Sequence, residues 1–205
     1  MVTKRKTAPI QSILQVRSIT MKIVAVLGSP RPRGNSALLA EAFLDIARER
    51  GAAVEVYLLN QMHFKGCQGC GKCKTESQAC VVEDDLKPVY ESIHGADILV
   101  LASPVYFGDL SGQLKCFWDR TYAWVNPDFS SRLAPGKKSV MFLAQGAPGE
   151  EMFNDIYPRY ERWLKMFGFA SNFVVRAVGV QAAGEVQNKP EPLAQARKLA
   201  QDLVG

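Results

Sequence analysis

A loop of nine residues, Gly-Ser-Pro-Arg-Pro-Arg-Gly-Asn-Ser at positions 28–36, combines two arginines, two hydroxyl groups and two glycines. An apolar run at 23–27 precedes this first loop, and apolar residues at three- and four-residue spacing follow it over 38–47. The pattern predicts a buried parallel strand, a turn and a helix. Unpaired amides and the dipole at a helix N-terminus attract anions, so we expect this loop to bind phosphate. An ordinary turn capped by Asn35 or Ser36 is the alternative.

Neither of the common nucleotide-binding motifs matches the first loop. The lysine of G-x-x-x-x-G-K-[ST] is missing, which argues against an NTPase. The glycine triplet of G-x-G-x-x-G is also missing after the strand, which argues against an ordinary dinucleotide-binding fold.

Four of the five cysteines lie within fourteen residues, at Cys67, Cys70, Cys73 and Cys80. In a cytoplasmic protein, which we expect this chain to be, clustered cysteines point to metal or redox chemistry more than to disulfides. Structural zinc usually takes two separated pairs, and bacterial ferredoxins place the fourth cysteine three residues on. A metal cluster, zinc and unliganded or redox-active thiols stay open. Cys116, alone in a predicted helix, is expected to be a buried apolar residue.

Strand and helix patterns alternate five times along the chain. Strands are predicted at 23–27, 54–59, 97–102, 138–143 and 172–178, and helices at 38–47, 84–94, 113–122, 150–167 and 190–204. Such alternation predicts an α/β fold, a five-stranded parallel sheet with helices on both faces, in the order 2-1-3-4-5. Ligands bind such sheets beyond the carboxyl ends of the strands. The first loop, a second at 103–111 and a third at 145–149 should meet there.

Charge and length exclude several classes of protein. With 205 residues we expect one domain at 21–205, and no apolar run reaches the ~20 residues of a membrane span. The net charge is +5, but four uncompensated basic residues lie in the first twenty and leave about +1 elsewhere, which disfavours nucleic-acid binding. Residues 1–20 are expected to be a disordered or loosely docked extension, with translation from Met21 as the alternative.

The motifs GSPRPRGNS and SPVYFGDLSGQLKCFWDR, with the cysteines between them, resemble the NAD(P)H-dependent FMN reductase and iron–sulfur flavoprotein group. The resemblance runs from residue 21 to about 183. It implies a flavodoxin-like three-layer α/β/α sandwich with non-covalently bound FMN. It also implies a 4Fe–4S cluster on Cys67, Cys70, Cys73 and Cys80, although FMN-only relatives with similar cysteines belong to the group as well.

Three loops would hold FMN if the resemblance is carried over residue by residue. Ser29, Arg31, Asn35 and Ser36 would bind the phosphate, with Gly34 allowing close backbone approach. The isoalloxazine ring would lie against Pro104, Val105, Tyr106, Phe107 and Gly108, and a third set of contacts would come from Gln145 and Gly146.

The expected function is that of an FMN-dependent oxidoreductase. FMN would take electrons from NAD(P)H or a reduced protein carrier and pass them to a small-molecule or protein acceptor. No side chain is assigned a catalytic role because the flavin carries the chemistry. The alternatives are a non-catalytic flavodoxin-like electron carrier, an FMN-only NAD(P)H reductase, and a redox sensor using the cysteines. Aromatic residues over 118–129 suggest a homodimer or homotetramer.

Overall fold

The computed structural model describes residues 20–205, so the expected N-terminal extension lies almost wholly outside the described residues. The elements in chain order are β1 (Lys22–Leu27), α1 (Asn35–Glu49), β2 (Ala53–Leu58), η1 (Leu59–Gln61), α2 (Lys72–Thr75), α3 (Leu86–His94), β3 (Ile98–Tyr106), β4 (Asp109–Leu110), α4 (Gly112–Arg120), η2 (Thr121–Trp124), β5 (Lys138–Ala144), α5 (Ile156–Met166), β6 (Ser171–Ala177), η3 (Glu185–Asn188) and α6 (Pro190–Leu203). No helix in this part of the chain is long and apolar enough to cross a membrane.

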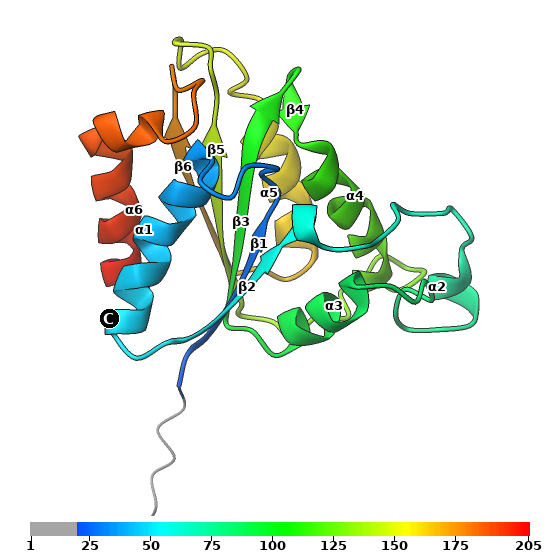
Figure 1. Ribbon diagram of the computed structural model, residues 1–205. Helices are drawn as coiled ribbons and strands as arrows, with labels where there is room; N and C mark the ends of the chain where they lie inside the picture. Colours follow the sequence, from blue (N-terminus) through cyan, green and yellow to red (C-terminus); the bar gives the residue numbers. More distant parts are fainter. Residues whose placement is uncertain (1–19) are drawn as a thin grey trace, which may run out of the picture.

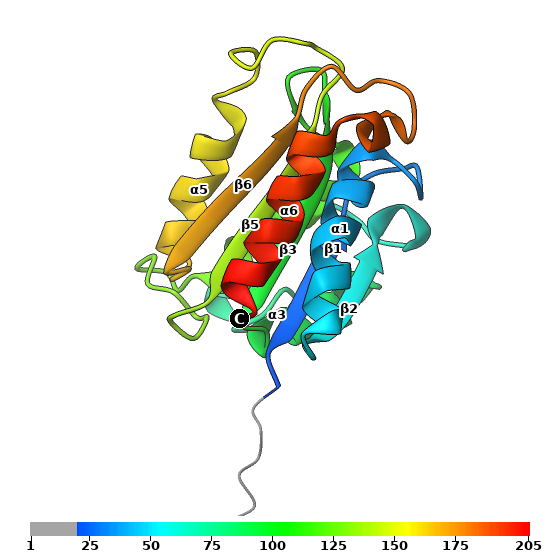
Figure 2. The same ribbon diagram turned by 90° about the vertical axis from the view of Figure 1, so that its left-hand side faces the viewer.

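The strands form one parallel sheet in the order β2-β1-β3-β5-β6, with the short β4 paired antiparallel to β3. Without β4 this is the predicted order 2-1-3-4-5, which is confirmed. Helices α1 and α6 cover one face of the sheet, and α3, α4 and α5 cover the other (Figures 1 and 2). The three layers are those of a flavodoxin-like fold.

Strand β1 is buried on both faces of the sheet, which explains its nearly continuous run of apolar residues. Ile23 and Ala25 pack into the core under α1 and α6, while Val24 and Val26 pack into the opposite core. All four side chains are completely buried, because both faces of a parallel sheet are covered. Burying a side chain such as Ile23 contributes about 1.5–3 kcal/mol to folding.

The third strand runs further than predicted. It does not end at 102 but continues to Tyr106 and forms a hairpin with β4, pairing Val105 with Leu110. At the turn, Phe107 and Gly108 have φ of 49° and 87°. Positive φ at both central residues is what a two-residue type I′ hairpin requires. The predicted second loop is therefore largely a β-hairpin that projects from the carboxyl edge of the sheet.

Helix α5 begins at Ile156, six residues after the predicted start at 150. The buried side chain of Gln145 and the half-buried side chain of Arg176 hold the preceding stretch out of the helix. The amide of Gln145 donates to the carbonyls of Ala147, Gly149 and Met152, at 3.0–3.3 Å. Arg176 donates to Gln145 Oε1 at 2.7 Å and to the Met152 carbonyl at 2.8 Å. Carbonyls engaged in this way fix residues 145–152 as a loop.

Candidate functional site: a cavity at the carboxyl edge of the sheet

A cavity of about 520 Å³ opens where β1, β3, β5 and β6 end. Eight of the predicted cofactor-binding residues line it: Ser29, Arg31, Gly34, Asn35, Pro104, Val105, Tyr106 and Gly146. The other lining residues are Ala144, Ala147, Met152, Phe153, Val180 and Gln181. Of the predicted set, Ser36, Phe107, Gly108 and Gln145 do not line the cavity. The structure therefore gathers the three predicted loops around one hollow.

The first loop is closed by its own hydrogen bonds. Ser29 Oγ accepts from the Arg31 amide at 3.1 Å, and the Gly34 amide donates to the Arg31 carbonyl at 2.9 Å. A Cβ placed on Gly34 would lie 2.3 Å from Ser29 Oγ, so any larger residue would displace that hydroxyl. Glycine at this position keeps the backbone close to whatever lies in the loop.

The N-terminus of α1 has no side-chain cap. Gly34 is the N-cap residue, so the alternative in which Asn35 or Ser36 caps the helix is wrong. The buried Ser36 hydroxyl has no hydrogen-bond partner within residues 20–205. A helix N-terminus without a side-chain acceptor, beside an unpartnered buried hydroxyl, offers donors to an anion.

Arg31 and Asn35 bind the opposite wall of the cavity instead of standing free. Arg31 Nη1 donates to the Gln181 carbonyl at 3.0 Å. The Asn35 amide donates to the Ala182 carbonyl at 2.9 Å and accepts from the Val186 amide at 3.1 Å. The buried Asn35 side chain thus joins the start of α1 to the turn after β6, and Arg31 brings a cation to the cavity rim.

A pair of serines fixes the hairpin relative to the first loop. Ser111 Oγ donates to the Gly28 carbonyl at 2.7 Å, and the Ser111 amide donates to Ser103 Oγ at 2.9 Å. The same Ser111 hydroxyl accepts from the Leu114 amide and caps α4. Because both serines are fully buried, their hydrogen bonds fix the position of the hairpin relative to the first loop.

Aromatic side chains of two loops meet at the mouth of the cavity. Tyr106 is half exposed and Phe107 stands fully exposed at the hairpin tip. Phe153 lines the cavity with a φ of 62°, and a Cβ on Gly108 would lie 3.6 Å from its ring. A bulky residue held at positive φ costs free energy and is typical of functional loops. No motif in the sequence marks Phe153.

Val180 and Gln181 were also missed as lining residues. They follow β6, and the loop after every parallel strand lies at the same edge of the sheet. The strand order alone could have found them. Gln145, by contrast, is buried, and all its recorded contacts fix the loop around it.

The four clustered cysteines lie away from the cavity, on the stretch that carries α2, beside α3 and the end of α4 (Figure 1). Cys67 and Cys70 are exposed, Cys73 and Cys80 are half buried, and all four are free thiols. Burial raises the pKa of Cys73, and nearby Cys80 and Cys67 raise it further against the opposing charges of Lys74 and Arg132. In residues 20–205 the thiols do not converge in metal-ligand geometry.

The family model described as NADPH-dependent FMN reductase matches residues 21–177, which contain all three loops and the cysteines. The chain belongs to this family. It is 36% identical over 148 residues to the iron-sulfur flavoprotein of Methanosarcina thermophila, an alignment covering 72% of this chain and 75% of that protein. It is 40% identical over 101 residues to an iron-sulfur flavoprotein of Methanocaldococcus jannaschii, covering 49% of this chain and 52% of the relative.

Solved structures show the same fold. The NAD(P)H:quinone oxidoreductase from Methanothermobacter marburgensis superimposes with a TM-score of 0.70 at 20% identity, covering 91% of this chain and 98% of that one. At the first loop, the uncapped N-terminus of α1, the guanidinium of Arg31 and the unpartnered Ser36 hydroxyl are donors of the kind that bind an anion.

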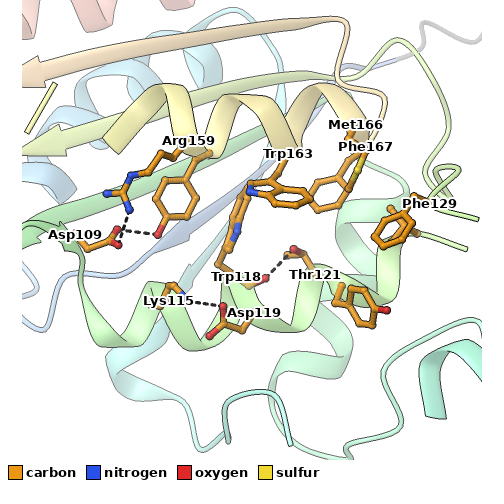
Figure 3. A pocket seen from close by; sticks show the side chains of 13 residues that line it. Asp109, Lys115, Trp118, Asp119, Thr121, Phe129, Arg159, Trp163, Met166 and Phe167 are labelled. Carbon is orange, nitrogen blue, oxygen red and sulfur yellow. Dashed lines mark hydrogen bonds and ion pairs between the residues drawn. The ribbon is translucent and has the colours of Figure 1, made fainter. Parts of the chain in front are cut away.

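Figure 3 shows a second cavity of this FMN reductase family member, about 390 Å³ in volume, between α4 and α5. Asp109 accepts from Tyr160 at 2.8 Å and from Arg159 at 3.2 Å. Burial raises the pKa of Asp109, but these bonds and the Leu110 amide outweigh it and bring the pKa below its usual value. Apolar side chains, Phe129 and Trp163 among them, form most of the remaining wall, together with Lys115, Asp119 and Thr121.

Several expectations around α4 need correction. Trp118 and Trp124 are core residues, so only Tyr122 and Phe129 of the aromatic stretch 118–129 are exposed large apolar side chains. The adjacent Asp119 and Arg120 pair with Lys115 and Asp84, respectively, and not with each other. Cys116 is half buried, not buried, and a Cβ placed on Gly66 would lie 3.4 Å from its Sγ.

Proposed function

We propose that this family member is an FMN-dependent oxidoreductase whose FMN takes electrons from NAD(P)H or a reduced carrier. One observation carries the proposal: the uncapped N-terminus of α1 and the cation of Arg31 stand at a cavity that Tyr106 and Phe153 also line, and the first turn of α1 holds the unpartnered Ser36 hydroxyl. The polar end suits a phosphate and the remainder suits a planar ring.

The residues have separate roles in this proposal. Ser29, Arg31 and Ser36 bind the phosphate, and Gly34 keeps the space for it. Asn35 orients the wall at 181–186 through its two backbone hydrogen bonds.

The hairpin and the third loop would form the ring site. Pro104, Val105 and Tyr106 flank the ring, with Gly146 opposite, while Phe107 and Gly108 at the hairpin tip and Gln145 beneath its loop support that site from outside the cavity. Bound FMN supplies hydride and single-electron transfer; the chain binds it, orients it and excludes water.

We further propose that Cys67, Cys70, Cys73 and Cys80 hold a 4Fe–4S cluster. Two facts support this: four free thiols lie within fourteen residues, and the relatives at 36% and 40% identity carry the name iron-sulfur flavoprotein. Thiolates are the ligands of such clusters. Zinc or unliganded redox-active thiols are the competing occupants, in which case the protein would be an FMN-only reductase.

The partners follow from the same proposal. NAD(P)H or a protein carrier is the donor, and a small molecule or a protein is the acceptor. We place the protein in the cytoplasm as a homodimer or homotetramer, with Tyr122 and Phe129 as the exposed aromatic residues that a second copy would cover.

Mixing the FMN-loaded protein anaerobically with NADPH or NADH tests the proposed reaction. We expect the oxidised flavin absorbance to bleach within a single exponential phase, and steady turnover to follow when a quinone or another small acceptor is added. Reduction by a chemical reductant but by neither nicotinamide would instead identify a flavodoxin-like electron carrier and contradict the assignment as an NAD(P)H oxidoreductase.

A further inference from the structure

Residues 63–85, here called the cysteine segment, are held in place without a core of their own. No residue from 60 to 85 is buried, and the regular structure within the segment is the single turn of α2. The ends of the segment are tied together, since the His63 amide donates to Asp85 Oδ2 at 2.6 Å. Apart from Phe64, which packs partly buried against the core, apolar burial, the usual source of order, is therefore weak in the segment.

Arg120, the last residue of α4, joins the two arms of the cysteine segment. Its side chain is 1% exposed. Nη1 donates to Asp84 Oδ2 at 2.6 Å and to the Lys65 carbonyl at 3.2 Å, and Nη2 donates to the Val82 carbonyl at 3.2 Å. Asp84 in turn accepts from the Lys65 amide at 3.1 Å. One guanidinium thus binds the chain just before Cys67 and just after Cys80.

Arg132 and Lys74 fix the middle of the cysteine segment. Arg132 Nη1 donates to the Cys73 carbonyl at 2.8 Å and to the Ala123 carbonyl at 3.1 Å. Lys74 Nζ, one residue on, donates to the carbonyls of Tyr122 and Val125. The tip of the segment is therefore joined to η2 and the strand-like residues after it, which pack on the core.

We propose that Arg120 and Arg132 are the positioning residues of the cysteine segment, which hold its backbone in one shape before the thiols bind anything. The part of this inference that concerns a bound cluster rests on the proposed function. A buried ion pair such as Arg120–Asp84 is weak evidence for stability, because desolvation offsets its attraction. Arg120 Nε is buried without a partner within residues 20–205, which adds to that cost. The contacts of Arg120 are therefore better explained by the arrangement of the cysteine segment than by a gain in stability.

Positioning matters because a backbone held at three points limits the rearrangement that the thiols, which do not converge among the described residues, would need in order to bind one centre together. Arg132 and Lys74 also bring positive charge next to Cys73, and their recorded acceptors there are uncharged oxygens. Both side chains therefore hold the segment through backbone carbonyls and not through the thiols.

Limited trypsin digestion of the metal-free, FMN-loaded protein tests the inference. The segment itself carries Lys65, Lys72 and Lys74 as cleavage sites. In Arg120→Gln and in Arg132→Gln, we expect cleavage at these sites to be about tenfold faster than in wild type, since proteolysis follows the population of the open form. Arg132→Lys, which keeps the positive charge and a hydrogen-bond donor, should recover part of the loss. Arg48→Gln, which removes two surface ion pairs on α1, is the matched control and should match wild type.

Iron and sulfide uptake per FMN gives the second readout. Arg120→Gln and Arg132→Gln should bind iron about tenfold more weakly at unchanged FMN content. Equal cleavage rates in all variants would overturn the inference, as would loss of FMN and cleavage spread over the whole chain. A wild type that takes up no iron, but shows the expected differences in cleavage, supports the positioning role and removes the cluster from the proposed function.

Discussion

Arg31→Ala combined with Asn35→Ala is expected to lower FMN affinity by about 100-fold or more, since each substitution removes hydrogen bonds of a charged or buried group. Arg31 supplies the cation at the cavity rim and holds the Gln181 carbonyl, and Asn35 holds Ala182 and Val186. Without them the phosphate end loses a donor and the opposite wall loses its attachment. Titration of the flavin-free protein with FMN, followed by quenching of flavin fluorescence, measures the change.

Gly34→Ala tests the same loop by crowding it. The new Cβ would meet Ser29 Oγ at 2.3 Å and the Arg31 carbonyl at 3.1 Å, so the loop must open where the phosphate is proposed to bind. Gly112→Ala is the matched control, because a Cβ there has no atom within 4 Å. We expect weak FMN binding in the first variant and wild-type binding in the second. Tight binding by both Gly34→Ala and the double variant would refute the phosphate assignment.

Cys73→Ser is expected to abolish the iron and sulfide content while leaving FMN bound. Thiolates are the ligands of iron–sulfur clusters, and a serine hydroxyl is a poor replacement. Cys73 is half buried and its carbonyl is held by Arg132, so its thiol is among the more enclosed of the four. Elemental analysis for iron and sulfide, with flavin absorbance on the same sample, measures both groups together.

Cys116→Ser is the control for that substitution, because Cys116 lies on α4 outside the cysteine segment. It should retain both iron and FMN. Full iron content in Cys73→Ser would show that this thiol is not a ligand. Zinc in place of iron in the wild type would show that the cysteines hold a structural zinc ion and not a 4Fe–4S cluster.

The sheet was the most predictable part of the molecule. Strands such as 23–27 and 98–102 are buried on both faces, so their side chains are apolar without interruption, and the sequence pattern follows from local geometry. The strand order followed from the handedness of the connections. The end of β3 was less predictable. Pro104 and Gly108 are typical of loops, and the pairing of Val105 with Leu110 that extends the strand is not marked by a sequence pattern.

The site could be predicted where its residues are neighbours in sequence, and less so where they are not. Ser29 and Gly34 lie in one turn, so their spacing can be recognised directly in the sequence. The partners of Asn35 lie 147 and 151 residues away, and Arg120 contacts Lys65 across 55 residues. Such contacts depend on how the layers pack, so sequence spacing carries no signal for them. Phe153, on a loop shaped by Gln145 and Arg176, was missed for the same reason.

The central claim is that the first loop binds the phosphate of FMN. Titrating the flavin-free wild-type protein with FMN and, separately, with riboflavin tests it most directly, because the two flavins share their ring and differ in the phosphate. We expect FMN to bind about 100-fold more tightly than riboflavin, as charge-assisted hydrogen bonds from the loop reach the phosphate alone. Equal affinities for the two flavins would contradict the account.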